Sequence, residues 1–509
     1  MDDKQHTSSS DDERAEIATS NQDQETNSSK RVHLKRWQFI SILIGTILIT
    51  AVITVVAYIF INQKISGLNK TDQANLNKIE NVYKILNSDY YKKQDSDKLS
   101  KAAIDGMVKE LKDPYSEYLT KEQTKSFNEG VSGDFVGIGA EMQKKNDQIM
   151  VTSPMKGSPA ERAGIRPKDV ITKVNGKSIK GKALDEVIKD VRGKENTEVT
   201  LTVQRGSEEK DVKIKREKIH VKSVEYKKKG KVGVITINKF QNDTSGELKD
   251  AVLKAHKDGL KKIVLDLRNN PGGLLDEAVK MANIFIDKGK TVVKLEKGKD
   301  TEAIQTSNDA LKEAKDMDIS ILVNEGSASA SEVFTGALKD YNKAKVYGSK
   351  TFGKGVVQTT REFKDGSLLK YTEMKWLTPD GHYIHGKGIK PDVTIDTPKY
   401  QSLNVIPNTK TFKVGDDDKN IKTIKIGLSA LGYKVDNEST QFDKALENQV
   451  KAFQQANKLE VTGEFNKETN NKFTELLVEK ANKHDDVLDK LINILKQAIH
   501  TTKIVLLLC

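Results

Sequence analysis

Hydrophobic residues are distributed unevenly along the chain, and the first long apolar run predicts a membrane span. Residues 39–60, FISILIGTILITAVITVVAYIF, contain no charged residue. As a helix they extend over roughly 33 Å, which matches a hydrocarbon core of about 30 Å. We therefore predict a transmembrane helix at residues 39–61. The preceding residues contain few aliphatic side chains, so we expect residues 1–38 to be a disordered tail.

The charges around this run predict its orientation. Four cations precede it closely, and the first cation after it is Lys64; the four are Lys30, Arg31, Lys35 and Arg36. Because cytoplasmic flanks carry the excess of Lys and Arg, the N-terminus is predicted to be cytoplasmic and everything after residue 61 to face outward. A cleaved signal peptide is the alternative, although the run is longer than a typical signal core and a long segment precedes it.

Beyond the span, the spacing of apolar residues predicts two different segments. In residues 72–130 they recur at helical intervals, as at Ile79, Val82 and Leu86, which predicts a helical region. In residues 131–215 short alternating runs such as TEVTLTVQ surround one helical stretch, LDEVIKDVRG. This second pattern predicts a compact β module with one main helix.

The remaining chain is predicted to hold an α/β core and a helical C-terminal part. Within residues 216–398 the runs VGVITI, KKIVLDL, ISILV and KVYG indicate strands buried on both faces of a sheet. Residues 399–417 lack periodicity and are predicted to be a linker. Residues 418–478 are predicted to form an all-α module, and residues 479–509 an amphipathic helix with an apolar tail, IVLLLC. That tail could pack on the preceding helix, touch the membrane or reflect an altered reading frame.

Composition and charge argue against several classes of function and of site. The 509 residues carry a formal net charge of +12, but the lysines alternate with acids and form no basic arm, which argues against nucleic-acid binding. The only cysteine is Cys509. The sequence therefore predicts no intramolecular disulfide and no thiolate metal cluster.

The stretch EGSASASEVF, residues 325–334, is a candidate nucleophile site. It follows an apolar strand and precedes a helix, so a serine here could project from a sharp turn as in other hydrolases. The spacing of Ser329 and Glu332 is also that of a capping box, which would require no catalysis. The nearest histidines, His382 and His385, lie more than 50 residues downstream.

Two glycine-containing stretches could complete such a site. RNNPGG joins a predicted buried strand to a helix. Such a turn can leave backbone N–H groups free to bind an oxyanion. The alternative is that its glycines are there for steric reasons alone. Lys354 lies between Gly353 and Gly355, and Gln358 is four residues further in an extended run, hence on the same strand face. A lysine base needs its pKa lowered by roughly 2 to 4 units through desolvation; an exposed loop lysine is the alternative.

Together these stretches resemble a known family. DPYSEYL, GIGA, LRNNPGG, SASASE and TFGKGVVQ, in this order and spacing over about residues 75–397, resemble the bacterial carboxyl-terminal processing proteases, also called tail-specific proteases. The resemblance implies a serine protease in which Ser329 is the nucleophile, Lys354 the general base and Gln358 the residue that orients the lysine, without a histidine. It also implies oxyanion donors at the N–H groups of Ala330 and of Gly272 or Gly273.

Asp340 is a fourth catalytic candidate, and two histidines are candidate metal ligands. In some members of this family an aspartate takes part in the relay, and it would correspond to Asp340. On a straight helix Asp340 would lie about 16 Å along the axis from Ser329, so we expect a structural role. The histidines of GHYIHGKGIKPDV lack a third ligand, and no metal or other cofactor is predicted.

The flanking modules have resemblances of their own. The module at 131–215 resembles a PDZ domain. The resemblance implies that the GIGA turn presents backbone amides to the terminal carboxylate of a substrate, while the substrate tail adds to the sheet as a strand. The residues of the GIGA turn are Gly137, Ile138, Gly139 and Ala140. The module at 418–478 resembles a peptidoglycan-binding domain through LGY, FDKALENQVKAFQQANKLEVTGEF and Thr469. A plain three-helix packing module is the alternative.

The sequence thus predicts an α/β (α+β) protease core with an inserted PDZ-like β module, an N-terminal transmembrane helix and a C-terminal all-α module. We expect a serine endopeptidase of the bacterial cell membrane, with its catalytic part at the cell wall. Its expected partners are the carboxyl-terminal tails of exported or misfolded proteins and peptidoglycan, with a homodimer as one option. A non-catalytic scaffold is the main alternative. A peptidoglycan hydrolase is a second alternative, but it would need paired carboxylates, and the sequence shows no recognisable site of that kind.

Overall fold

The computed structural model describes residues 35–66, 69–145, 147–436 and 438–508. Most of the predicted N-terminal tail, residues 1–34, and Cys509 lie outside this range. The chain divides into two compact units, Met1–Ala103 and Ile104–Cys509. Each unit is therefore described by itself.

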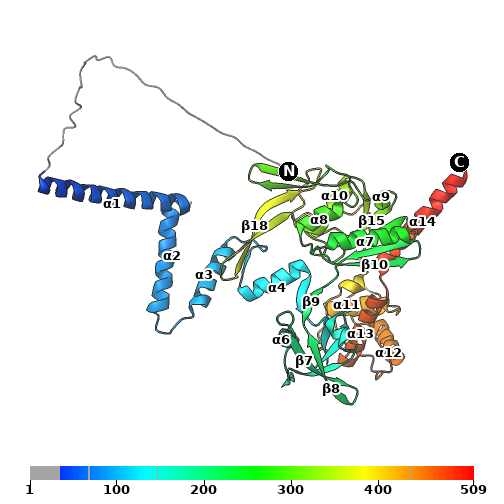
Figure 1. Ribbon diagram of the computed structural model, residues 1–509. Helices are drawn as coiled ribbons and strands as arrows, with labels where there is room; N and C mark the ends of the chain where they lie inside the picture. Colours follow the sequence, from blue (N-terminus) through cyan, green and yellow to red (C-terminus); the bar gives the residue numbers. More distant parts are fainter. Residues whose placement is uncertain (1–34, 67–68, 146, 437, 509) are drawn as a thin grey trace, which may run out of the picture. The chain divides into compact units, whose positions relative to one another are not determined.

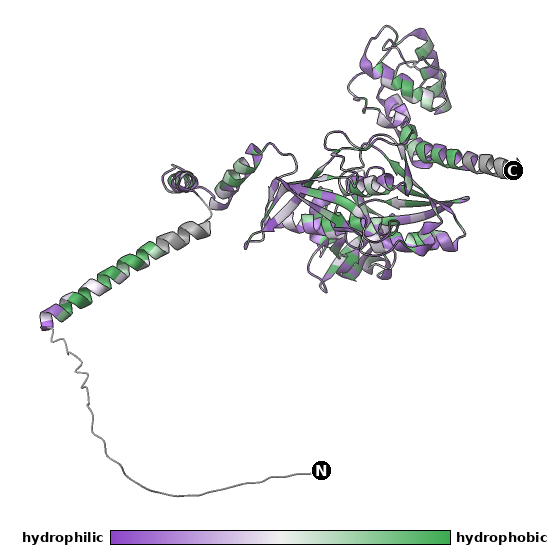
Figure 2. Cartoon of the chain, turned by 90° about the horizontal axis from the view of Figure 1, so that it is seen from above, coloured by the Kyte–Doolittle hydropathy of each residue, from purple (hydrophilic) through white to green (hydrophobic). Residues whose placement is uncertain are grey.

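The first unit is helical and contains the apolar run. Helix α1 (Arg36–Ser66) includes Arg36–Ala57, a stretch long and apolar enough to cross a membrane by length and composition, a property that signal sequences share. Figure 2 shows this stretch as predominantly hydrophobic. Helix α2 (Lys70–Ser88) follows, and α3 (Ser96–Glu110) crosses into the second unit. Several apolar side chains of α2 are exposed, namely Leu76, Ile79, Val82, Ile85 and Leu86.

A six-stranded sheet forms the centre of the second unit. Its order is β10-β11-β12-β15-β16-β19, and all neighbours are parallel except β10 and β11. The inner strands are buried almost throughout, as expected for strands covered on both faces. The strands are β10 (Val224–Lys229), β11 (Val232–Ile237), β12 (Lys262–Asp266), β15 (Asp318–Val323), β16 (Ala344–Gly348) and β19 (Val393–Thr394).

Helices cover both faces of this sheet. One face packs on α7 (Thr244–Lys257), α8 (Leu275–Ala282) and α10 (Ala330–Asp340), which Figure 1 labels. Side chains of these helices share one apolar cluster with the strands. The opposite face packs on α14 (Asp486–Leu508), the last helix of the chain. The C-terminal helix is therefore part of the core.

A second sheet completes the core and contains a strand that periodicity missed. Its order is β1-β18-β13-β14, with β17 paired to β18. Strand β1 (Glu117–Leu119) lies within the region that we predicted to be helical, because three residues are too few to show alternation. The other strands are β13 (Thr291–Lys297), β14 (Asp300–Gln305), β17 (Val356–Glu362) and β18 (Leu368–Leu377). Helix α4 (Lys121–Ser132) contacts β1, and the short helix α9 (Lys312–Lys315) contacts α7.

The inserted module is a small β domain with its own core. Its sheet has the order β3-β4-β5-β7-β8, with β6 on β5, and a separate ladder of β2 and β9 forms its base. Residues Gly137 and Glu217 are partners in that ladder, so the module enters and leaves the core at one place. The elements are β2 (Asp134–Gly137), β3 (Ala140–Lys145), β4 (Gln148–Pro154), α5 (Pro159–Arg162), β5 (Val170–Val174), β6 (Lys177–Ser178), α6 (Leu184–Val191), β7 (Glu198–Arg205), β8 (Glu208–Lys215) and β9 (Glu217–His220).

The C-terminal helical module differs from the predicted boundaries at both ends. Ile406 and Phe412, in the segment predicted to be a linker, are buried in the core of the module; two isolated apolar anchors give no periodic signal. Helix α13 (Lys467–Lys483) passes residue 478, and the last helix begins at Asp486. The other elements are η1 (Lys399–Ser402), α11 (Lys419–Ala430) and α12 (Lys444–Ala456).

Candidate active site

The three alternating serines have different surroundings. Ser327 and Ser331 are fully buried, and their hydroxyls donate to the carbonyls of Leu267 (2.8 Å) and Asn270 (2.9 Å). Only Ser329 lines a cleft at the surface of the core. The outer serines therefore join two loops, and the middle one is available to a substrate.

Ser329 lies where strand β15 turns into helix α10, and its backbone is strained. Its φ is +56° and its ψ is −117°, a combination that costs free energy for any residue other than glycine and persists only where neighbours enforce it. Ser329 and Glu332 have the arrangement of a capping box, yet the Ser329 hydroxyl makes no capping hydrogen bond. The turn thus holds the hydroxyl away from its own helix.

The buried carboxylate of Glu332 connects the serine turn to the lysine loop. Its Oε2 accepts hydrogen bonds from the N–H groups of Ser329 (2.9 Å) and Lys354 (2.8 Å). Its Oε1 accepts from the Gly353 N–H (2.7 Å) and the Thr351 hydroxyl (2.6 Å). One side chain therefore sets the distance between the backbones of the two candidate catalytic residues, a role that the capping spacing alone could not indicate.

Lys354 has an environment that favours a neutral amine. Burial lowers the pKa of Lys354 most, the charge of Lys370 lowers it further, and the charges of Asp113 and Glu332 only partly oppose this. Its Nζ lies 4.8 Å from the centroid of the Tyr115 ring, and the described residues place no carboxylate within ion-pair distance of it. The cause is the desolvation that a lysine base requires. Tyr115 was not singled out from the sequence, although it belongs to the DPY stretch.

Gln358 shares the cleft with Lys354, but not through simple strand alternation. Strand β17 begins only at Val356, and its pairing with β18 shifts register between Val357 and Gln358. The expected extended run from Lys354 to Gln358 is therefore interrupted by a bulge. Both side chains nevertheless line the cleft, and the Gln358 amide donates to the Thr372 hydroxyl at 3.1 Å.

The RNNPGG turn lies against the serine loop and separates the two candidate oxyanion glycines. The Gly272 N–H donates to the Asn270 side chain at 2.9 Å, and Gly272 is buried. Gly273 is exposed, and among the described residues neither its N–H nor that of Ala330 has a hydrogen-bond partner. These two N–H groups are thus free to bind a developing negative charge, whereas the Gly272 N–H is already used.

The cleft that these groups line has a volume of about 750 Å³. Apart from the polar groups described above, most of its wall is apolar. Such a wall excludes water and accepts an extended peptide with small or apolar side chains. The apolar residues include Phe127, Val131, Leu274, Leu275, Val333, Val356, Val357 and Trp376.

Asp340 and the two histidines do not line the cleft. Asp340 is not among the residues that line the cleft, and its carboxylate accepts from the Asp380 N–H at 3.0 Å. His385 Nδ1 accepts from the Gly355 N–H at 3.2 Å, which supports the lysine loop. In the described ranges no group of three or more His, Cys, Asp or Glu side chains could hold a metal.

The GIGA turn of the β module has the features of a carboxylate-binding loop. Gly139 has a φ of +70°, and a Cβ there would meet the Ser158 Cβ at 2.5 Å, so the turn requires glycine. The N–H groups of Ile138 and Gly139 have no hydrogen-bond partner in the described chain. The turn leads through Ala140 into β3, an edge strand that contacts α6. An extended peptide could therefore add to this edge.

Comparison with protein-family models divides the chain in a similar way. Residues 231–395 match peptidase family S41, and residues 150–205 match the PDZ domain. Residues 59–123 match the N-terminal domain of the activating protease CtpB, and residues 417–473 match a peptidoglycan binding domain.

Individual relatives extend over nearly the whole chain. The "Probable CtpA-like serine protease" of Staphylococcus aureus (strain MSSA476) is 99% identical over 496 residues, which cover 97% of this chain and 100% of that protein. The protein of the same description from Staphylococcus epidermidis (strain ATCC 12228) is 70% identical over 493 residues, 97% of this chain and 99% of its own. Among solved structures, the photosystem II D1 C-terminal processing protease is 30% identical, with a TM-score of 0.38 over 61% of this chain and 86% of its own.

Proposed function

Because this chain belongs to peptidase family S41, the C-terminal processing serine proteases, we propose that it cleaves proteins outside the cytoplasmic membrane through a Ser329–Lys354 dyad. One observation carries the proposal. Ser329 and a desolvated Lys354 line the same cleft, and Glu332 hydrogen bonds to the backbone of both.

The proposed chemistry follows from these positions. The neutral amine of Lys354 accepts the proton of the Ser329 hydroxyl as the serine oxygen attacks the substrate carbonyl. The N–H groups of Gly273 and Ala330 stabilise the resulting oxyanion. The protonated lysine then gives its proton to the leaving amine. The lysine, neutral again, then takes a proton from a water molecule that attacks the acyl-enzyme, and it returns this proton to the Ser329 oxygen as the ester bond breaks. Gln358, which lines the same cleft, is proposed to orient the lysine.

We further propose that α1 anchors the enzyme in the membrane, with the catalytic part at the cell wall. The length and apolar composition of Arg36–Ala57 and the cations before it support a single span with the N-terminus in the cytoplasm. The peptidoglycan-binding module supports association with the wall.

The PDZ domain is proposed to capture the carboxyl-terminal tails of exported or misfolded proteins. The support comes from the unpaired N–H groups of the GIGA turn and from the edge strand β3 beside α6. Main-chain pairing would give affinity for many tails, and side chains of the neighbouring helix α6 would contribute selectivity.

A homodimer is part of the proposal, and α2 is its candidate contact. Exposed apolar side chains recur along this helix at the spacing of a stripe, with Ile79 at 45%, Val82 at 51% and Ile85 at 55% exposure. A stripe of this kind is stabilised by packing on another helix. Cross-linking of the full-length wild type and of the Val82→Asp variant tests this contact. We expect a cross-linked dimer for the wild type and its loss in the variant, and a dimer that persists in the variant would contradict the contact.

The experiment that tests the catalytic proposal compares full-length proteins in detergent. The substrate is a loosely folded protein with an apolar carboxyl terminus, and the variants are Ser329→Ala and Lys354→Ala. The controls are Ser349→Ala and Lys350→Ala, the same changes outside the cleft. We expect the wild type and both controls to cut, and both dyad variants to fold without cutting.

Two outcomes would decide against the proposal. If the dyad variants cut like the wild type, the assignment of Ser329 and Lys354 is wrong. If no protein cuts while the wild type binds carboxyl-terminal tails, the non-catalytic scaffold becomes the better interpretation.

A further inference from the structure

Helix α14 joins the peptidoglycan-binding module directly to the protease core. Only two residues separate it from α13, which ends at Lys483. Its side chains Leu488 and Leu491 are buried against the central sheet, in one cluster with Val264 and Leu322. The last helix in the sequence is therefore a structural layer of the catalytic core.

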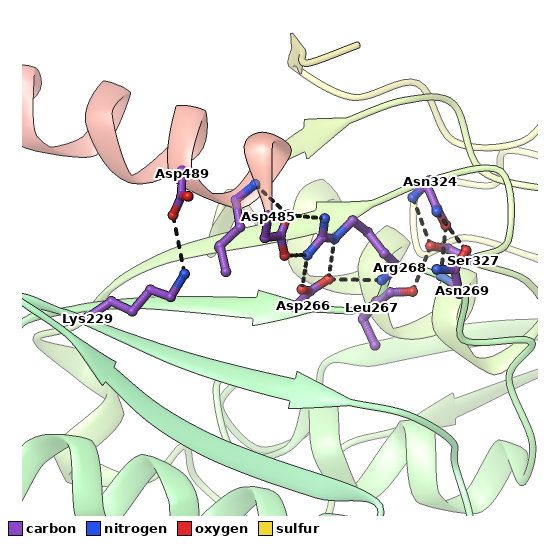
Figure 3. Close-up of polar contacts among 10 residues, drawn as sticks. Lys229, Asp266, Leu267, Arg268, Asn269, Asn324, Ser327, Asp485 and Asp489 are labelled. Carbon is purple, nitrogen blue, oxygen red and sulfur yellow. Dashed lines mark hydrogen bonds and ion pairs between the residues drawn. The ribbon is translucent and has the colours of Figure 1, made fainter. Parts of the chain in front are cut away.

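At the start of α14, Asp485 binds an arginine that precedes the oxyanion turn. Arg268 donates two hydrogen bonds to the Asp485 carboxylate (2.8 and 2.5 Å) and two to Asp266 (2.9 and 2.6 Å), as Figure 3 shows. The Arg268 side chain is 19% exposed and that of Asp266 is 7% exposed. A bidentate pair of this kind fixes orientation as well as distance.

The Asp485 carboxyl stays ionised and can therefore keep its ion pair with Arg268. Burial alone raises the pKa of the Asp485 carboxyl, but the hydrogen bonds and charge of Arg268 outweigh burial and keep that pKa below its ordinary value. Asp485 also accepts from the Leu488 N–H at 3.0 Å, which caps α14. The contact therefore connects the rigid end of a helix to the turn.

From Arg268 the contacts continue into the candidate site. Asn269, the next residue, has a φ of +56°, which neighbouring contacts must maintain. Its N–H donates to Asn324 at 2.8 Å, and its side chain accepts from Asn324 at 2.9 Å. The segment 267–273 is thus held by α14 on one side and by the serine loop on the other.

We propose that Asp485 is a positioning residue of the peptidase, which holds Arg268 and thereby the 269–273 turn that binds the oxyanion. The inference rests on the oxyanion role given to this turn above. It assigns the C-terminal helix a part in turnover in addition to its connection with the wall-binding module.

The matched control lies one turn further along the same helix. Asp489 pairs with Lys229 at 3.2 Å, so it also joins α14 to the central sheet, but Lys229 is not part of the oxyanion turn (Figure 3). The experiment measures peptide cleavage by the full-length protein in detergent for Asp485→Asn and Asp489→Asn. It also measures inhibition by a peptide aldehyde, whose serine adduct places an oxygen in the oxyanion site.

We expect Asp485→Asn to lower kcat by about 10-fold or more, with KM little changed, because a small displacement of oxyanion donors acts on the transition state. The affinity for the aldehyde should fall by a similar factor. Asp489→Asn should stay within about twofold of the wild type in both measurements. A merely structural role of Asp485 would lower the unfolding temperature without this division between kcat and KM.

The inference is overturned if Asp485→Asn folds and matches Asp489→Asn in kcat and aldehyde affinity. If Asp485→Asn does not fold, Arg268→Lys decides, since it keeps the charge and removes the bidentate geometry: a kcat loss supports the inference and wild-type kcat overturns it. Ser329→Ala is measured in parallel. If Ser329→Ala is still active, the proposed dyad has failed, whatever Asp485→Asn does.

Discussion

The Glu332 carboxylate provides the most direct test of how the dyad is held together. Glu332 is fully buried and accepts four hydrogen bonds, two of them from the backbones of Ser329 and Lys354. In Glu332→Gln, one acceptor oxygen becomes an NH₂ group, so at least one buried N–H loses its partner. The other bonds become neutral and weaker. The substitution changes no volume and therefore isolates the charge and the acceptors.

The magnitude follows from the number of bonds. A hydrogen bond to a charged group contributes about 1.5–3 kcal/mol and a neutral one about 1 kcal/mol, so one lost bond and three weakened bonds should lower the free energy of unfolding by roughly 3–9 kcal/mol. This is an upper bound, because the amide avoids the cost of burying a charge. The loosened turn should lower kcat/KM by about 10- to 100-fold. Urea unfolding and peptide kinetics, both measured where the variant is folded, check the two effects.

Glu247→Gln is the matched control. The Glu247 carboxylate also accepts hydrogen bonds from two backbone N–H groups, those of Ser223 and Val224 (2.8 and 3.0 Å), but it does not line the cleft. The Glu247→Gln variant should have a lower free energy of unfolding and an unchanged kcat/KM. The reasoning is refuted if Glu332→Gln keeps both its unfolding free energy and its kcat/KM, or if the control loses activity equally.

Three further predictions concern the base, the oxyanion site and the PDZ domain. The lysine base must be neutral, so kcat/KM should rise with pH through a pKa below that of an ordinary lysine. Lys370→Gln removes a repelling cation and should move this limb to higher pH, whereas Asp113→Asn should move it to lower pH; unchanged pH profiles would exclude Lys354 as the titrating group. Gly273→Ala, whose Cβ would lie 2.0 Å from a backbone oxygen, should lower kcat about 100-fold or more, and a fully active variant would contradict the oxyanion assignment. We also expect the PDZ domain to inhibit the active site until a tail binds. Replacing residues 138–216 by a short link between the paired strands should then leave basal peptide cleavage intact or raised, and a folded but inactive protein would contradict a purely inhibitory role.

Periodicity and local motifs were sufficient for the buried strands of the central sheet and for the helices that precede the core. The buried runs correspond to β11, β12, β15 and β16, and the helical intervals to α2 and α3. The strand-turn-helix character of the serine stretch was also evident, because such turns depend on small residues close together in sequence. Short or isolated features were missed, as with β1 and the anchors Ile406 and Phe412.

What the sequence alone determined, then, is the local backbone: apolar spacing specifies which face of each element is buried, and glycines specify where the chain turns. It also supplied the motifs that identified the family. Only the tertiary structure decided which groups are available for chemistry. It buried the outer two serines, used the Gly272 N–H and left that of Gly273 without a partner among the described residues. It brought Tyr115 to Lys354 and Asp485 to Arg268. The physical reason is that desolvation and hydrogen-bond pairing depend on residues far apart in the chain, which meet only when the layers pack.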